Sequence, residues 1–334
     1  MKQSNFWVQR LGSALETRKD LLENDHVTGL RLFNGFYEGW DELVVDLYAS
    51  TLVLYRYPAT DGTDANLLEE VQAYLLERLD FVTCVVCKDR GEQDPLRRKG
   101  MVTFGEAPTQ KIREHRIWYA LDLLMNQDAS FYLDMRNLRK WLLENAEDWS
   151  ILNLFAYTGS LGVAGLAGGA RQVIQVDRKA GFLELARRSA MFNHLDLGKM
   201  KLAAGDFFSK VAYYKRRAEL FDCVIVDPPF FSSTEKGVVD LVKDGVRVIN
   251  KARPLVRDGG RLVAINNALY LSGADYMQAL ERLCADGYLS IDQLVLVPDD
   301  VTGYPVTIVK SPPTDPAPFN HPTKIVVLNV RRKS

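Results

Sequence analysis

Acidic residues follow three consecutive predicted strands in the C-terminal two-thirds of the chain. Asp177, Asp206 and Asp227 each come shortly after a short apolar segment. Because the carboxyl ends of parallel strands meet at one edge of a sheet, we expect these carboxylates to converge on one crevice. A carboxylate after the second strand can accept hydrogen bonds from both hydroxyls of a ribose, and one after the third from an adenine amino group. The spacing therefore predicts a site for a ligand that contains a nucleoside.

The segment Asp227-Pro228-Pro229-Phe230 discriminates best between kinds of ligand. Its two prolines lack a backbone donor and stiffen the chain, while their carbonyl groups can still accept hydrogen bonds. Together with the carboxylate they can bind an exocyclic amine, and Phe230 can stack on a base. The structural alternative is a rigid proline turn after a buried strand. The carboxylates that follow the two preceding strands favour the base-binding interpretation.

The first strand of this region is followed by Phe155-Ala156-Tyr157-Thr158-Gly159. A glycine at position 159 lets the backbone bend sharply and approach a ligand closely, and the next helix would present unpaired N–H groups to it. A tight turn without a ligand is the alternative. A nicotinamide dehydrogenase would normally carry Gly-x-Gly-x-x-Gly here, but Gly159 is followed by Ser160, Leu161 and Gly162.

A regular alternation of strands and helices positions these segments from about residue 149 onward. Such alternation predicts an α/β fold whose parallel sheet is covered on both faces. Two strands without an intervening helix end the chain, joined by a proline-rich loop, and predict an antiparallel strand at the sheet edge. The predicted strands are 151–155, 172–176, 200–203, 221–226, 261–265, 289–297 and 324–330, and the predicted helices are 159–167, 180–193, 207–217, 236–256 and 274–284.

The first 110 residues read as a smaller α+β domain. Strands are predicted at 43–48, 51–55 and 82–87, a helix at 67–79, and an exposed loop at 89–100. We therefore divide the chain into domain 1–110, a candidate substrate-recognition domain, and domain 111–334, which carries the ligand site.

Composition excludes several classes of protein. The chain has 334 residues, 42 basic and 43 acidic side chains and a net charge of −1, so it does not coat nucleic acid by charge alone. A basic patch near residues 88–98 and 136–140 could contact phosphates, or could be a solvated charged face.

Cys84 and Cys87 fall on opposite faces of one strand, which argues against a metal site. No apolar stretch is long enough for a membrane span, and a reducing cytoplasm is expected.

The same residues resemble a known family, the class I S-adenosylmethionine-dependent methyltransferases. Within it the chain is similar to the large-subunit ribosomal RNA lineage that includes a cytosine carbon-5 enzyme and the guanine nitrogen-7 half of a fused bifunctional enzyme. The resemblance runs from about residue 30 to the end. Its matching segments are 131–136, 152–160, 168–170, 176–177, 205–208 and 227–230.

The resemblance implies a Rossmann-like, mainly parallel seven-stranded sheet that binds S-adenosylmethionine and releases S-adenosylhomocysteine. The segment Tyr132-Leu133-Asp134-Met135-Arg136 would pack over the donor, although Asp134 and Arg136 could equally be a helix cap and a surface charge. The implied donor-binding residues are Tyr132, Asp134, Arg136, Phe155, Tyr157, Thr158, Gly159, Asp177, Arg178, Asp206 and Phe207.

The chain departs from the family pattern in two ways. Only about 30 residues precede the central region, so the family's N-terminal RNA-binding module is expected to be absent. Carbon-5 members carry a nucleophilic cysteine after the strand that follows Asp-Pro-Pro, because the ring must be attacked before it is methylated. Here that position reads Ile265-Asn266-Asn267-Ala268, which looks more like the nitrogen-7 guanine enzymes.

We therefore expect methyl transfer to a base nitrogen, with guanine in ribosomal RNA as the favoured acceptor. Asp227, Pro228, Pro229, Phe230 and Asn266 are the candidate catalytic residues, with Asn267 as a second candidate for reading the base edge. A small-molecule or protein methyltransferase, a carbon-5 cytosine enzyme and a non-catalytic binding protein are the alternatives. The sequence leaves a homodimer open.

Overall fold

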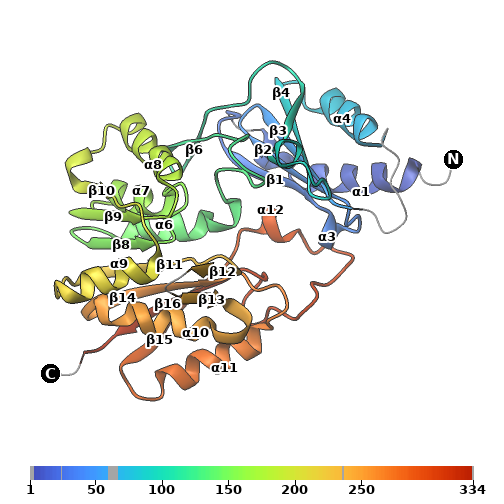
Figure 1. The fold of residues 1–334 in the computed structure, drawn as a ribbon. Helices are drawn as coiled ribbons and strands as arrows, with labels where there is room; N and C mark the ends of the chain where they lie inside the picture. Colours follow the sequence, from blue (N-terminus) through green and yellow to red (C-terminus); the bar gives the residue numbers. More distant parts are fainter. Residues whose placement is uncertain (1–3, 24, 59–66, 235–236, 333–334) are drawn as a thin grey trace. The chain divides into compact units, whose positions relative to one another are not determined.

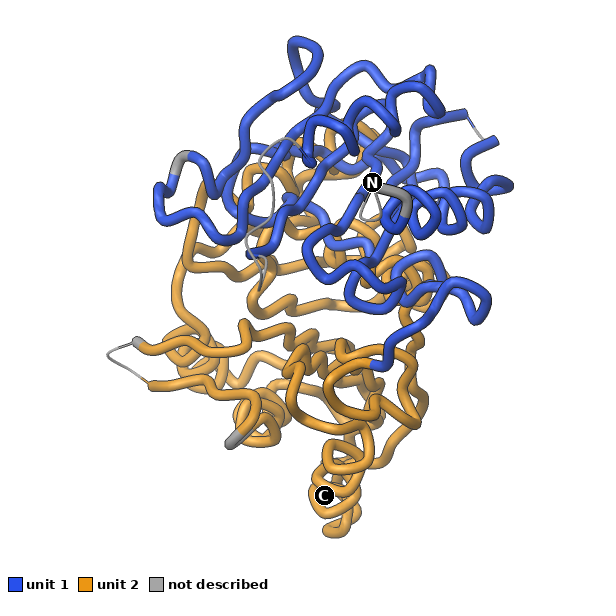
Figure 2. Tube along the Cα trace, turned by 90° about the vertical axis from the view of Figure 1, so that its right-hand side faces the viewer, with its two compact units in different colours: residues 1–133, 298–311 blue, residues 134–297, 312–334 orange. Residues whose placement is uncertain are grey.

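The computed structural model describes residues 4–23, 25–58, 67–234 and 237–332, and the chain divides into two compact units (Figure 2). Unit 1 comprises residues 1–133 and 298–311, and unit 2 comprises residues 134–297 and 312–334. The predicted division after residue 110 falls inside unit 1, and two separately folding domains remain a prediction. Within the described residues no helix combines the length and the apolar character that crossing a membrane requires.

Unit 2 contains the predicted α/β sheet, with seven strands among its described residues (Figure 1). Their order is β10-β9-β8-β11-β14-β16-β15, and β16 alone runs antiparallel to its neighbours β14 and β15. The fold class is thus confirmed, including the antiparallel strand near the sheet edge. The strands are β8 (Ser150–Leu154), β9 (Gln172–Val176), β10 (Met200–Leu202), β11 (Phe221–Val226), β14 (Val256–Asn266), β15 (Leu289–Val295) and β16 (Lys324–Val330).

Helices cover both faces of this sheet because its strands are apolar on both sides. Alternate strand residues such as Leu152, Leu154 and Val226 pack with the helices α9, α10 and α11 in one core cluster. The opposite face of β8 and β9 packs against α7. The helices are α6 (Arg136–Asn145), α7 (Ser160–Ala167), α8 (Ala180–Phe192), α9 (Phe207–Arg216), α10 (Leu241–Ala252) and α11 (Gly273–Cys284), with 3₁₀ turns η1 (Leu133–Met135), η2 (Leu197–Lys199) and η3 (Arg253–Leu255).

Strand register aligns the carboxyl ends at one edge. Leu154 at the end of β8 pairs with Val176 on one side and with Val226 on the other. The chain runs outward from β8 in both directions, through β9 and β10 on one side and through β11 and β14 on the other. The topological switch point, where open α/β sheets bind ligands, is therefore between β8 and β11.

Unit 1 contains a five-stranded sheet of order β1-β2-β3-β4-β5 within its described residues. The helices α1 and α4 cover one face of it, and their apolar residues share a core with those of β1, β2 and β3. The strands are β1 (Gly29–Asn34), β2 (Leu43–Tyr48), β3 (Thr51–Arg56), β4 (Cys84–Asp89), β5 (Met101–Phe104), β6 (Lys111–Glu114) and β7 (Ile117–Ala120); the helices are α1 (Ser4–Thr17), α2 (Lys19–Leu22), α3 (Gly35–Glu38), α4 (Leu67–Arg78), α5 (Pro95–Lys99) and α12 (Asp299–Thr302).

A buried ion pair explains why residues 298–311 belong to unit 1. Arg18 and Glu38 are both fully buried and form a bidentate pair at 2.9 and 3.1 Å. The same guanidinium donates to the carbonyl oxygen of Asp300 at 2.9 Å, and the Asp300 carboxylate accepts from the backbone N–H of Arg31. These hydrogen bonds hold α12 against the other elements of unit 1.

Three sequence predictions were wrong in detail. The predicted loop 89–100 contains the short helix α5. The predicted helix 236–256 begins only at Leu241, because residues 237–240 form β13 (Gly237–Asp240), which pairs with β12 (Phe231–Thr234); residue 236 lies outside the described residues. Lys88 and Arg139, counted in the basic patch, are fully buried, whereas Arg97, Arg98 and Lys99 on α5 are exposed.

We predict that Arg18→Met lowers the free energy of unfolding by about 3–5 kcal/mol, because it leaves the Glu38 carboxylate buried without its partner. Urea denaturation measures the change. Arg97→Met is the matched control in the same unit, since the Arg97 side chain is 62% exposed in its pair with Glu92 and a surface pair contributes about 1 kcal/mol or less. Equal losses in the two variants would contradict the assignment.

Candidate active site

The loop after β8 has an unusual backbone. Phe155, Tyr157 and Gly159 all have positive φ angles, of 61°, 52° and 75°. Non-glycine residues in this region cost roughly 1–2 kcal/mol each, so the surrounding structure must hold them there. At Gly159 a side chain is excluded as well, because a Cβ would lie 2.5 Å from the Cβ of Ala186. Strain of this kind concentrates at functional sites, and this loop lies at the switch point of the sheet.

A buried pair of amides supports this loop from beneath. Asn153 and Gln175 face each other across β8 and β9, and the Asn153 amide donates to the Gln175 side-chain oxygen at 2.8 Å. The Gln175 amide in turn donates to the carbonyl oxygen of Gly159 at 2.8 Å. Gly162 makes room for it, since a Cβ there would lie 2.3 Å from the Gln175 nitrogen. The sequence reasoning missed both amides, because they lie inside apolar strands.

Asp177 is the first acidic residue at the carboxyl edge, directly after β9. Its two carboxylate oxygens accept from the backbone N–H groups of Tyr157 at 2.9 Å and of Lys179 at 3.0 Å. Each oxygen has a second lone pair, so the donor set fits two ribose hydroxyls. Thr158 of the same loop is buried, and Arg178 is exposed.

Asp206 lies at the same edge, after β10. The N–H of Gly205 bonds to the carbonyl oxygen of Asp177 at 2.9 Å, which ties the two loops together. Asp206 caps α9 by accepting from the N–H of Ser209 at 3.0 Å. Phe207 is buried and stacks on Phe155 with 4.9 Å between ring centroids. Its ring therefore backs the first loop and presents little free surface.

Asp227 follows β11, whose last residue pairs with Leu154. Its backbone N–H bonds to the Leu154 carbonyl oxygen at 3.4 Å, and the side chain is half-buried. Burial, together with the nearby Asp134 carboxylate, raises the pKa of Asp227 to about 7. Pro228 is buried and Pro229 is exposed. Asp177, Asp206 and Asp227 thus follow β9, β10 and β11 at one end of the sheet, with β8 between β9 and β11.

The segment before α6 contributes Asp134, which lies in η1. Its carboxylate accepts from the hydroxyl of Thr323 at 2.9 Å, and its charge reaches Asp227. Arg136 is the first residue of α6 and is half-buried. Tyr132 belongs to unit 1, is exposed, and donates from its hydroxyl to Asp128 at 3.5 Å; its contact with the donor remains a prediction.

Asn266 is the last residue of β14, Asn267 follows it, and the two differ in exposure. Asn266 is buried: its side-chain nitrogen donates to the carbonyl oxygen of Leu241 at 3.4 Å, and its oxygen accepts from the N–H of Ala268 at 2.9 Å. Asn267 is exposed. Of these two side-chain amides, only that of Asn267 is exposed to solvent.

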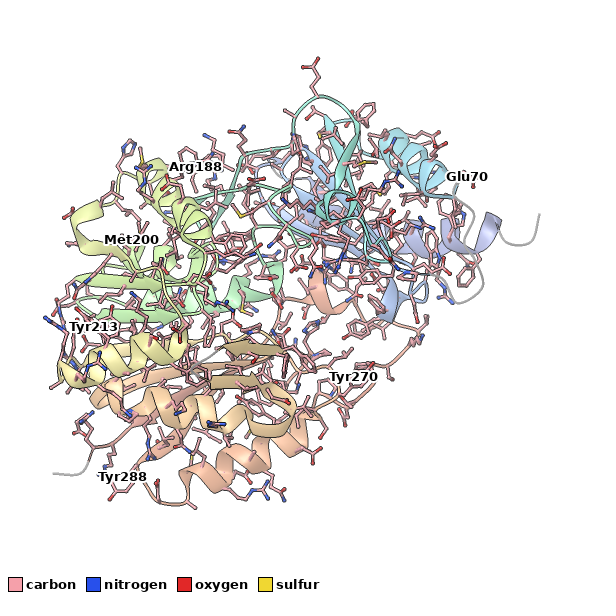
Figure 3. All side chains as sticks on the ribbon, in the orientation of Figure 1. Glu70, Arg188, Met200, Tyr213, Tyr270 and Tyr288 are labelled. Atoms are coloured by element: carbon pink, nitrogen blue, oxygen red, sulfur yellow. The ribbon has the colours of Figure 1, made fainter. Side chains whose placement is uncertain are left out.

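Exposed aromatic side chains follow the same strands. Phe230 and Phe231, after β11, are 46% and 58% exposed. Tyr270, in the loop after β14, is 70% exposed and is labelled in Figure 3. Since β11 and β14 are parallel neighbours, the two loops lie at the same edge of the sheet.

The four cysteines are all poorly suited to act as nucleophiles. Cys223 is fully buried in the middle of β11, and burial raises its pKa well above the usual range. Cys284 lies on α11, where burial and two nearby carboxylates raise the pKa of its thiol. In unit 1, burial raises the pKa of Cys84 and brings that of Cys87 to about 12. A reactive thiol requires the opposite shift.

Comparison with known proteins identifies the family to which the chain belongs. The sequence signature of the family described as S-adenosylmethionine-dependent methyltransferase matches residues 101–292. The ribosomal RNA large subunit methyltransferase I of Aliivibrio fischeri (strain MJ11) is 30% identical over 300 residues, which are 87% of this chain and 73% of that protein. The protein of the same name from Aeromonas salmonicida (strain A449) is 29% identical over 294 residues, 85% of this chain and 71% of that protein.

Solved structures share the fold. A protein described as a methyltransferase, crystallised in complex with SAH, superposes with a TM-score of 0.84 at 22% identity and covers 97% of this chain and 81% of its own. A protein described as a SAM-dependent methyltransferase from Streptococcus mutans gives a TM-score of 0.82 at 21% identity, with the same coverage.

We predict that Asp227→Asn stabilises the protein increasingly as the pH rises. The raised pKa means that the folded protein binds a proton more tightly than the unfolded chain, so the wild type loses stability between the ordinary pKa of an aspartate and about 7. The Tm advantage of the variant should therefore be larger at pH 8.5 than at pH 5.5, by a few degrees. Asp148→Asn, whose side chain is 82% exposed, is the control. An advantage that does not change with pH would contradict the raised pKa of Asp227.

Proposed function

Because the chain belongs to the S-adenosylmethionine-dependent methyltransferases, we propose that it methylates a base of ribosomal RNA, with a guanine nitrogen as the favoured acceptor. Relatives named ribosomal RNA large subunit methyltransferase I, which match most of the chain, support RNA as the substrate. The single observation that carries the choice of nitrogen is the state of the cysteines, none of which is an activated thiol.

The donor side of the site is assigned to the loops after β8, β9 and β10. Asp177 would accept from the ribose hydroxyls, and Asp206 from the adenine amino group. Gly159, fixed by Gln175, would let the backbone approach the amino-acid part of the donor at the start of α7. When bound, S-adenosylmethionine supplies an electrophilic methyl group on a sulfonium, and sulfur keeps the C–S electron pair when that methyl is transferred.

The acceptor side is assigned to the loops after β11 and β14. The Asp227 carboxylate and the following proline carbonyls would accept from an exocyclic amine of the base, and Phe230 would stack on its ring. Asn267 would read the base edge, because the Asn266 amide is engaged with the backbone. These contacts align a ring-nitrogen lone pair with the methyl group, and alignment is the main contribution that such a transfer needs from the protein.

The thiols argue against methylation at a ring carbon. Carbon-5 of a pyrimidine becomes nucleophilic only after a thiolate has added to the neighbouring carbon. The segment in which the resemblance expects that cysteine contains Asn266 and Asn267 instead, and Cys223 is fully buried inside β11. A ring nitrogen of guanine carries its own lone pair and needs no such addition.

Exposed aromatic and basic residues favour a polynucleotide over a small molecule or protein. Phe230, Phe231 and Tyr270 offer faces on which unpaired bases can stack. On unit 1, helix α5 presents Arg97, Arg98 and Lys99 to solvent, and such side chains contact phosphates.

The direct test is to incubate the protein with ribosomal RNA transcribed in vitro, which carries no modification, and with methyl-labelled S-adenosylmethionine. We expect label in a methylguanosine after digestion to nucleosides, and at least a 100-fold loss in Asp227→Ala, which removes the contact to the base. Label in 5-methylcytidine would refute the nitrogen assignment. Absence of label from RNA, with label in a protein or metabolite fraction, would refute RNA as the substrate.

We predict that Asp177→Asn weakens binding of S-adenosylmethionine by about 10- to 100-fold, because hydrogen bonds to a charged group contribute about 1.5–3 kcal/mol. Isothermal titration calorimetry measures the Kd. Asp196→Asn is the matched control: Asp196 also accepts a backbone N–H bond, from Gly198, but is exposed next to η2. Unchanged affinity in the Asp177 variant would remove this residue from the donor site.

A further inference from the structure

The first residue of β16 lies at the edge of the sheet where the parallel strands end. This follows from direction: β16 runs antiparallel to β14, so its amino end meets the carboxyl end of β14, and Lys324 pairs with Asn266. The site motifs all follow parallel strands and therefore do not include this residue. Lys324 lies beyond residues 101–292, which the family signature covers.

Lys324 is fully buried and bonded to two backbone carbonyl groups. Its ammonium donates to Ala268 at 3.0 Å and to Pro322 at 2.7 Å. Among the described residues no carboxylate pairs with it, and burial lowers its pKa to about 8. Burying an ammonium without a carboxylate partner costs stability, and its hydrogen bonds to the two carbonyl groups offset part of that cost. These bonds therefore restrain the turn that contains Ala268.

The turn that Lys324 contacts is held from several sides. The Asn266 side chain bridges the carbonyl oxygen of Leu241 and the N–H of Ala268. The Ala268 carbonyl oxygen accepts from the Lys324 ammonium and from the N–H of Leu271 at 3.3 Å. Asn267 stands between these fixed points with an exposed side chain.

We propose that Lys324 is a positioning residue that holds the Asn266–Ala268 turn so that the Asn267 amide meets the edge of the target base. This inference rests on the proposed function, in which Asn267 reads the base. A compact tetrahedral donor suits two carbonyl groups that approach from different directions, which the planar fork of an arginine does not. Thr323, the preceding residue, donates from its hydroxyl to Asp134, the carboxylate whose charge reaches Asp227.

The test is a double-mutant cycle on RNA methylation with Lys324→Met, Asn267→Ala and the double variant. We expect each single change to lower kcat by about 10- to 100-fold and the double change to add less than about 3-fold, because both disrupt one contact to the base. The Kd for S-adenosylmethionine should stay within about 2-fold of wild type, since the donor residues follow other strands.

Lys88→Met is the matched control. Lys88 is also a fully buried lysine, with its pKa lowered to about 8, and it donates to the carbonyl oxygens of Lys99 and Asn126 in unit 1. A general loss of stability should affect both lysine variants, whereas coupling to Asn267 should occur only for Lys324. Additive effects of Lys324→Met and Asn267→Ala would overturn the inference.

A readout that needs no substrate separates this inference from the proposed function. Hydrogen exchange at the amides of Ala268 and Leu271 should become at least 10-fold faster in Lys324→Met and stay unchanged in Lys88→Met. If the wild type labels no RNA, the proposed function fails while this exchange still decides whether Lys324 holds the turn. Should Lys324→Met not fold, Lys324→Gln takes its place: its amide is uncharged and shorter than the ammonium, which weakens the bonds to both carbonyl groups, while its two donor hydrogens help the chain to fold. A smaller increase in exchange at Ala268 and Leu271 is then expected, and no increase would overturn the inference.

Discussion

The hydrogen bond from Gln175 to the carbonyl oxygen of Gly159 is the interaction on which the loop after β8, proposed to bind the methyl donor, depends. It fixes a loop in which alternate residues adopt left-handed backbone conformations. Such conformations are strained in residues other than glycine, so they persist only where the surrounding structure holds them. Asn153 orients the glutamine, and Gly162 leaves the space that it occupies. The same loop directs the N–H of Tyr157 to Asp177. Removing the amide would therefore release both the turn and the carboxylate.

Charge is distributed unevenly around the carboxyl edge of the sheet. Asp227 lies next to a second carboxylate in a half-buried position, so its pKa approaches neutrality, whereas Lys324 is a buried cation bonded only to carbonyl oxygens. Both groups are held in states that cost stability. Groups whose burial costs stability concentrate at functional sites, and these two residues lie at the strand ends where we propose that the acceptor binds.

Local pattern was sufficient for most of the fold because each strand of unit 2 is a short apolar run bounded by helices or turns. Helix α5 and the hairpin β12–β13 were missed, since a short charged helix and a two-strand pairing have little local signal. The boundary between the units could not be predicted from the sequence either. Residues 298–311 belong to unit 1 and contact it through Arg18 and Asp300, which are far apart in the sequence. Pairings between distant segments carry no periodicity that a sequence window could detect.

By itself the sequence determined the class of fold, the methyl donor and the strand ends at which Asp177, Asp206 and Asp227 lie, because these depend on strand order and on motifs read along one segment. Tertiary structure alone decided which side chains support them. Gln175 looked like part of an apolar strand, and Lys324 like a residue that begins the last one. Gln175 supports the loop after β8 and Lys324 the turn after β14, each through a partner on another segment, and such partners are set by register and direction in the folded sheet.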